Sequence, residues 1–162
     1  MFQKALFVFG IFVSIHAFAE PVTGDQVSYT LTHVKGEWVD NVFSMTKEVL
    51  AIDDNAQTVS VRQIYSQNGK TLSNQTAAAP AGSVAYPDDA TIATCGIISY
   101  PGQTGLPETI TVAAGTFNTC HIVLDNNAGE FWAAAVPFGF VKSVNTNSTG
   151  TMTVELTSFL KK

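Results

Sequence analysis

Hydrophobic and polar residues alternate through most of this chain, and helical periodicity is almost absent. Alternation is the pattern of a β-strand that buries one face. It predicts strands over residues 27–32, 42–52, 59–66, 109–113, 117–124, 130–136, 138–144 and 152–160. With one weaker segment considered below, about eight or nine strands at short spacing and no βαβ pattern predict a mainly β fold. We expect an antiparallel sheet that curves into a barrel or half-barrel.

Turn residues separate these segments. Asn68-Gly69 is the strongest hairpin signal, because both residues tolerate a positive φ. Gly115 allows a tight reversal between two further strands, and Gly139, between two phenylalanines, is a natural bend point of a curved sheet. Pro137 cannot donate a ladder hydrogen bond, so we expect it at an edge, a bulge or a strand start.

The stretch from Thr71 to Asp89 differs from its surroundings, because it is rich in small, polar, proline and glycine residues. It predicts a long loop or a weak edge strand. Pro87-Asp88-Asp89-Ala90 has the composition of a helix start, with acids at the N-terminus as the helix dipole prefers. We therefore predict at most one or two short helices, of which this one, running towards Cys95, is the only one placed.

The N-terminus has the three parts of a secretory signal peptide over residues 1–19. Lys4 supplies the positive charge, Ala5–Ile15 is an apolar run, and Ala17-Phe18-Ala19 puts small residues before a cut at Glu20. The run is shorter than the roughly 20 apolar residues that a spanning helix needs. No Cys lies near the cut, so no lipid attachment is expected. We predict that residues 20–162 form a single soluble β-domain, exported to the periplasm or secreted.

The net charge of that domain limits the classes of partner that it is expected to bind. Removing Lys4 leaves seven Lys and Arg against thirteen Asp and Glu, a net charge of −6. Arg62 is the only arginine, and apart from the terminal Lys161-Lys162 the cations are scattered. A protein that binds nucleic acids or anionic membrane surfaces through electrostatics needs clustered Lys and Arg side chains. This chain has no such cluster along its predicted strands, so neither partner is expected.

Two cysteines, Cys95 and Cys120, lie in the exported part. An isolated pair in an oxidising compartment usually forms a disulfide, and only one pairing exists here. A redox-active dithiol would need a Cys-x-x-Cys spacing or a low-pKa setting, and the sequence contains no such spacing. We predict a structural disulfide.

Catalytic and metal-binding patterns are missing. His33 and His121 have no spacing that favours a metal site, and Asp53-Asp54 and Asp88-Asp89 fall in turn contexts typical of solvated acids. Gly-x-Ser-x-Gly, Ser-x-x-Lys at a helix start and phosphate-binding glycine patterns do not occur. We expect no enzyme, metal or cofactor; convergence of either histidine with a carboxylate in a pocket would favour a hydrolase instead.

Three blocks in the C-terminal half carry a family resemblance. They are residues 108–117 with Cys120 shortly after, residues 136–143 (VPFGFVKS) and residues 155–159 (ELTSF). Over roughly residues 90–160 the chain resembles uncharacterised bacterial periplasmic proteins with a fold like that of the lipoprotein-localisation carriers. The resemblance implies a curved antiparallel sheet around short helices, with an apolar cavity for acyl chains. It assigns no role to a particular residue.

Two functions remain open. The first is a non-enzymatic binding protein that holds a lipid or other apolar ligand on the concave face of the sheet. Strand phase suggests as lining Met45, Val61, Phe117, Phe131, Phe138 and Phe140. The alternative is an envelope structural or protein-interaction module, whose aromatic residues fill the core and whose segment 71–89 contacts an envelope protein.

Overall fold

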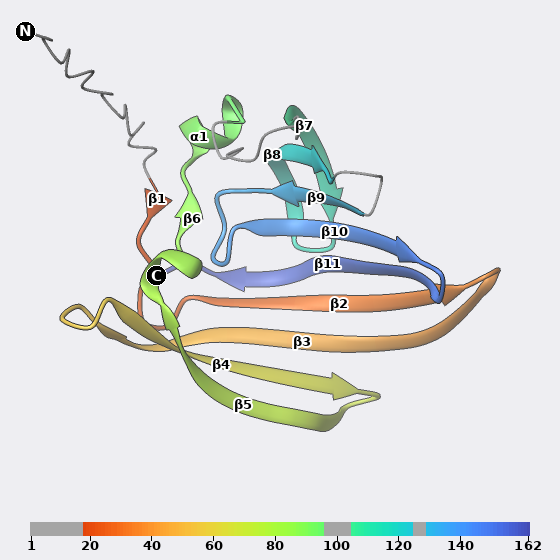
Figure 1. Ribbon diagram of the computed structural model, residues 1–162, viewed down its shortest axis with the longest axis horizontal. Helices are drawn as coiled ribbons and strands as arrows, with labels where there is room; N and C mark the ends of the chain where they lie inside the picture. The colour runs from red at the N-terminus through yellow and green to blue at the C-terminus, as the bar shows by residue number, and fades with distance from the viewer. Residues whose placement is uncertain (1–17, 96–104, 125–128) are drawn as a thin grey trace, which may run out of the picture.

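The computed structural model describes residues 18–95, 105–124 and 129–162. Nine long strands are β2 (Gln26–Lys35), β3 (Trp38–Asp53), β4 (Thr58–Gln67), β5 (Lys70–Pro80), β7 (Gly105–Val112), β8 (Gly115–Val123), β9 (Gly129–Ala133), β10 (Phe140–Asn147) and β11 (Gly150–Leu160). They form one antiparallel sheet in the order β5-β4-β3-β2-β11-β10-β9-β8-β7 (Figure 1). Since β5 and β7 are its two edges, the sheet is open. The prediction of a mainly β fold with a curved antiparallel sheet is confirmed.

One pairing joins the two halves of the sheet. Every other pairing in this sheet joins strands that follow one another in the chain, whereas β11 returns to pair with β2 so that Leu156 lies opposite Tyr29. The register shifts between Phe140 and Lys142, and again between Leu156 and Ser158. Bulges of this kind bend strands and increase their twist, which accounts for the curvature of the sheet.

The remaining elements are short. β1 (Phe18–Ala19) pairs with β6 (Tyr86–Pro87), η1 (Ala81–Ser83) is a 3₁₀ turn, and α1 (Asp89–Ala93) is a helix. β1 consists of the last two residues of the predicted signal peptide, and residues 1–17 lie outside the described residues. Within the described ranges, no helix has the length and apolar character needed to cross a membrane.

Local signals in the sequence explain several of these elements. Asn68 and Gly69 have φ values of 51° and 75°, so the predicted hairpin between β4 and β5 is confirmed. The helix α1 begins as predicted, and the Asp88 carboxylate caps it by accepting a 2.7 Å hydrogen bond from the Thr91 N–H. The sequence predicts either a long loop or a weak edge strand for the segment from Thr71. Most of it forms β5, an edge strand of the sheet.

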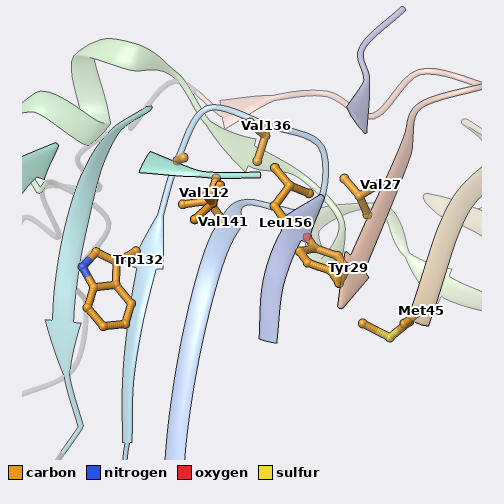
Figure 2. Close-up of a cluster of buried hydrophobic side chains, with 9 residues drawn as sticks. Val27, Tyr29, Met45, Val112, Trp132, Val136, Val141 and Leu156 are labelled. Atoms are coloured by element: carbon orange, nitrogen blue, oxygen red, sulfur yellow. The ribbon is translucent and has the colours of Figure 1, made fainter. Parts of the chain in front are cut away.

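The core lies mainly on one face of the sheet, which we call the inner face; it carries Val27 and Tyr29 of β2. A cluster of buried side chains from both halves of the sheet lies here (Figure 2): Val27, Tyr29, Met45, Val112, Trp132, Ala134, Val136, Val141 and Leu156. Contacts between strands far apart in the sequence thus hold the two halves of the sheet together.

A second cluster lies under α1. It consists of Ile92, Cys95, Cys120, Ile122 and Ala133, with Phe131 packed against it. The predicted disulfide is confirmed: Cys95 and Cys120 are bonded, with their Cα atoms 5.2 Å apart. The bond ties the end of α1 to β8.

A buried carboxylate connects the two ends of the described chain. Asp25 is fully buried, and its oxygens accept hydrogen bonds from the backbone N–H groups of Val22 (2.9 Å) and Lys162 (3.0 Å). Its own carbonyl accepts from the Val49 N–H at 2.9 Å. Buried polar groups are stable only when bonded in this way. Asp25 therefore fixes the C-terminus against the start of β2.

Candidate functional site

A groove of about 310 Å³ lies on the inner face of β3, β4 and β5. We call it the β3–β5 groove. The three strands form its floor, and the segment after β5 and the turn between β9 and β10 form its opposite wall. Its lining residues are Lys47, Val61, Gln63, Gln75, Ala77, Ala79, Ser83, Val84 and Phe138. The volume is at the lower end of the range of small-molecule sites.

Strand alternation builds the floor of the groove, because residues opposite one another on adjacent strands share a face. The register places the inner-face residues in three rows: Val49, Val61 and Ala77; Lys47, Gln63 and Gln75; Met45, Tyr65 and Ser73. On β5 the side chains nearest the apolar row are alanines. Their small size leaves open the space beside Val61 that larger residues would fill.

Phe138 forms the wall opposite the floor. It lies in a turn in which the Gly139 N–H donates to the Val136 carbonyl at 2.9 Å, with Pro137 before it. Phe138 has a φ of 63°, a left-handed conformation that non-glycine residues adopt only at a cost of about 1 kcal/mol or more. Such strain persists where the surroundings hold the residue in place and concentrates at functional sites.

Lys47 is the one cation of the groove lining. Its Nζ lies 5.6 Å from the centre of the Phe138 ring, within cation–π range. Burial lowers the pKa of the Lys47 ammonium from its usual range, since apolar surroundings disfavour the charged form. Within the described part of the chain, no carboxylate lies within ion-pairing distance of Lys47.

Two of the six residues predicted as lining, Val61 and Phe138, meet across this groove. Met45 is buried in the neighbouring row, where its sulfur lies 3.4 Å from the amide nitrogen of Gln63. Phe140 stacks on Tyr29, with ring centres 4.7 Å apart, and so fills the core instead of facing the groove.

The other two predicted residues lie elsewhere. Phe117 packs against Phe159, with ring centres 5.8 Å apart, and Phe131 packs against the cluster under α1. The structure therefore brings together two of the six residues, leaves Met45 adjacent, and distributes three phenylalanines through the packed parts of the fold.

Sequence reasoning missed the polar residues of the groove. Lys47 has the same phase as Met45 and Val49, and Gln63 has the same phase as Val61 and Tyr65. A long polar side chain at an inward-facing position is an informative exception to alternation. That exception is the signal that could have found the site.

A second hollow, of about 350 Å³, lies near the N-terminal end of the described chain. Phe18, Glu20, Asp53 and Asp54 are among its lining residues. Phe18 precedes the predicted signal cleavage and would be absent from the mature chain. The β3–β5 groove contains no residue from before Glu20 and is the stronger candidate.

A polar cluster surrounds His121. Its Nε2 lies 3.0 Å from a Glu130 carboxylate oxygen and its Nδ1 3.2 Å from Glu108, and its ring stacks on Trp132 at 4.3 Å. The Trp132 indole N–H donates to Glu108 at 2.8 Å. His121 therefore converges with two carboxylates, one at each ring nitrogen, and among the described residues neither nitrogen is hydrogen-bonded to a hydroxyl or thiol that could serve as a nucleophile.

His33 lies on another strand, with its Nδ1 3.3 Å from Asp40. In the described ranges, no group of three or more His, Cys, Asp and Glu side chains is arranged to hold a metal ion. The two histidines do not converge on one another.

Comparison with known proteins identifies solved structures with a similar fold but assigns the chain to no family. No protein-family model and no curated protein matches this sequence. A solved structure of a candidate lipoprotein from Parabacteroides distasonis ATCC 8503 matches with a TM-score of 0.53 and 13% identity, over 86% of this chain and 96% of that one. A candidate exported protein with a YmcC-like fold from Bacteroides fragilis NCTC 9343 matches with a TM-score of 0.54 and 14% identity, over 89% and 99%.

These matches extend over most of each chain, so the fold of this protein is similar over most of its length to that of both neighbours, one of which is described as YmcC-like. At such low identity the likeness concerns the fold alone. The finer resemblance to the lipoprotein-localisation carriers stays a prediction.

Proposed function

We propose that this protein is an exported, non-enzymatic binding protein that holds a lipid or other apolar ligand in the β3–β5 groove. The observation that carries the proposal is the groove itself, about 310 Å³ between an alanine-lined floor and Phe138. Phe138, whose backbone is left-handed, lines the groove together with Val61. An apolar chain lying between these side chains would be removed from water on both sides.

Export is supported by the signal-like residues 1–19 and by the names of the structural neighbours, one a candidate lipoprotein and one a candidate exported protein. The net negative charge of the mature domain favours solubility in an aqueous compartment. N-terminal sequencing of the protein from its host is expected to begin at Glu20. An unprocessed N-terminus at Met1 would contradict export by this route.

One observation favours the alternative, an envelope interaction module. β5 is an edge strand of 11 residues, most of them exposed, and Leu72 on it is 54% exposed. An exposed edge can accept an added strand from a partner protein. Ligand binding in the groove and strand addition at the edge use different groups, so the two functions can be tested separately.

A matched pair of variants tests the binding function. Ala79→Trp places an indole in the groove, whereas Ala78→Trp, one residue earlier, places it on the opposite face of the same strand. Native mass spectrometry of protein purified gently from its host is expected to show an apolar adduct on the parent and on Ala78→Trp, but not on Ala79→Trp. A parent protein without adduct that also takes up no apolar probe would refute the proposal and leave the edge strand as the functional element.

A further inference from the structure

The β3–β5 groove has a polar row across its floor. Lys47, Gln63 and Gln75 lie directly opposite one another on three adjacent strands, with an apolar row on one side of them. Side chains in such a row have Cβ atoms about 5 Å apart, so their ends can converge on one small group. The groove therefore joins an apolar wall to a short line of hydrogen-bond donors.

The position of Lys47 lowers the stability of the unliganded protein, because its charged group is partly removed from water. On β3 it occupies the inward phase between Met45 and Val49, both of which are buried. Desolvation disfavours its charged form, and the Phe138 ring offsets only part of that cost. A methionine or leucine would fill this place without that desolvation cost, so packing alone does not account for the ammonium group.

The acids near Lys47 in the sequence do not compensate its charge. Glu48, the next residue, points to the opposite face, where its carboxylate pairs with Arg62. On the outer face of these two strands, the positive charge of Arg62 is therefore balanced by the negative charge of Glu48. Among the groove-lining residues there is no Asp or Glu, so the groove itself carries one positive charge and no negative one.

The amides of the row can add to this charge. The Gln63 side-chain nitrogen donates to the Tyr65 hydroxyl at 2.5 Å and to the Met45 sulfur at 3.4 Å. Because a thioether sulfur is only a weak acceptor, an anionic headgroup can replace it as the partner of the second N–H. Gln75 is exposed at the β5 side of the groove. Charge-assisted hydrogen bonds from an ammonium and neutral amides are the usual way in which a carboxylate or phosphate is held.

From this arrangement we infer that the ligand is an amphipathic anion, whose acidic headgroup contacts Lys47 while its apolar chain lies between Val61, the β5 alanines and Phe138. The inference rests on the proposed function and adds the class of ligand. Carboxylate and phosphate headgroups share the required chemistry, and the experiment below distinguishes them.

Four probes with the same chain isolate the headgroup: dodecanoate, dodecyl phosphate, dodecanol and dodecyltrimethylammonium. Binding to the delipidated mature chain near neutral pH is measured by titration calorimetry below the aggregation threshold of each probe. We expect one of the two anions to bind about tenfold or more tightly than dodecanol, and the cation to bind more weakly than dodecanol. The tighter anion identifies the headgroup.

Lys47→Met is the decisive variant, because it keeps the length of the side chain and removes its charge. It is expected to reduce anion affinity about tenfold or more while changing dodecanol affinity less than about twofold. Lys70→Met, at the exposed start of β5, is the control for net charge and is expected to leave all four affinities unchanged. Since Lys47→Met removes a partly desolvated charge, the variant is expected to unfold at a urea concentration no lower than that of the parent.

The two proposals fail in different ways. Equal affinity for dodecanoate, dodecyl phosphate and dodecanol, or anion binding that Lys47→Met leaves intact, would overturn the inference while the binding function stands. Absence of binding for all four probes would overturn the binding function itself.

Discussion

Tyr29 and Phe140 are joined by two interactions. Their rings stack with centres 4.7 Å apart and planes 10° from parallel, and the Tyr29 hydroxyl donates a 3.1 Å hydrogen bond to the Phe140 carbonyl. Tyr29 lies on β2 and Phe140 on β10, with β11 between them. Burial raises the pKa of the Tyr29 phenol, so the hydroxyl keeps its proton and remains a donor throughout the physiological range.

Tyr29→Phe tests the hydrogen bond separately from the stacking. The variant keeps the ring and removes one buried donor, so the free energy of unfolding is expected to fall by about 1 kcal/mol. Tyr29→Leu also loses the aromatic pair and is expected to lose at least a further 0.5 kcal/mol or so. Urea unfolding followed by fluorescence measures both. A Tyr29→Phe variant as stable as the parent would show that the hydroxyl contributes nothing in solution.

Much of this framework follows from the sequence. Alternation around Val27 and Tyr29 predicts a strand and assigns its buried face, and Asn68-Gly69 predicts a hairpin because only positive-φ turns match the strand twist. The return of β11 to β2 could not be predicted in this way. That pairing joins residues such as Leu156 and Tyr29 through the closure of the whole domain, which no local pattern encodes.

The disulfide between Cys95 and Cys120 is expected to stabilise the domain substantially. It closes a loop with a sequence separation of 25 and fixes α1 to β8. In the chain-entropy model such a loop contributes about 3 kcal/mol. Cys95→Ala combined with Cys120→Ala is expected to lower the free energy of unfolding by about this amount, measured in urea.

Reduction of the parent protein provides the internal control for that measurement. Addition of dithiothreitol should lower the stability of the parent to that of the double variant and leave the double variant unchanged. A parent that is equally stable with and without reductant would show that the bond does not constrain the unfolded chain.

Helix α1 is expected to lose its N-cap in acid. Hydrogen bonds from the Thr91 side chain and then its backbone N–H lower the pKa of the Asp88 carboxyl below its usual value. A carboxyl whose folded-state pKa is lowered contributes stability above its unfolded pKa, and that contribution disappears as the pH falls through the folded-state value. The loss therefore begins below about pH 4.

Asp88→Asn separates this effect from general acid unfolding. Asparagine caps helices about as well as aspartate and does not titrate in this range. The variant is expected to match the parent near neutral pH and to show a smaller decrease in stability between neutral pH and pH of about 3, measured by urea titrations at each pH. Identical pH profiles for the two proteins would mean that Asp88 does not act as the cap.

The sequence allowed only some of the residues that line the β3–β5 groove to be predicted. Strand phase identifies inward residues such as Val61 but cannot tell whether the space opposite them is filled. That depends on Ala77 and Ala79 of a strand whose composition resembles a loop, and on the path of the chain that carries Phe138 back over them. Inward polar residues such as Lys47 were visible in the sequence and are the better local signal.

Phe138 provides a test of whether the groove wall is held under backbone strain. Phe138→Ala and Phe138→Gly both remove the ring, so both are expected to weaken binding of an apolar probe. They differ at a φ of 63°, where glycine is unstrained and alanine is not. The free energy of unfolding of Phe138→Gly is therefore expected to exceed that of Phe138→Ala by about 1 kcal/mol, after the greater freedom of glycine in the unfolded chain has offset part of the relief. If Phe138→Ala were the more stable variant in urea, the turn would not have this conformation in solution, and the strain could not serve to position the ring over Lys47.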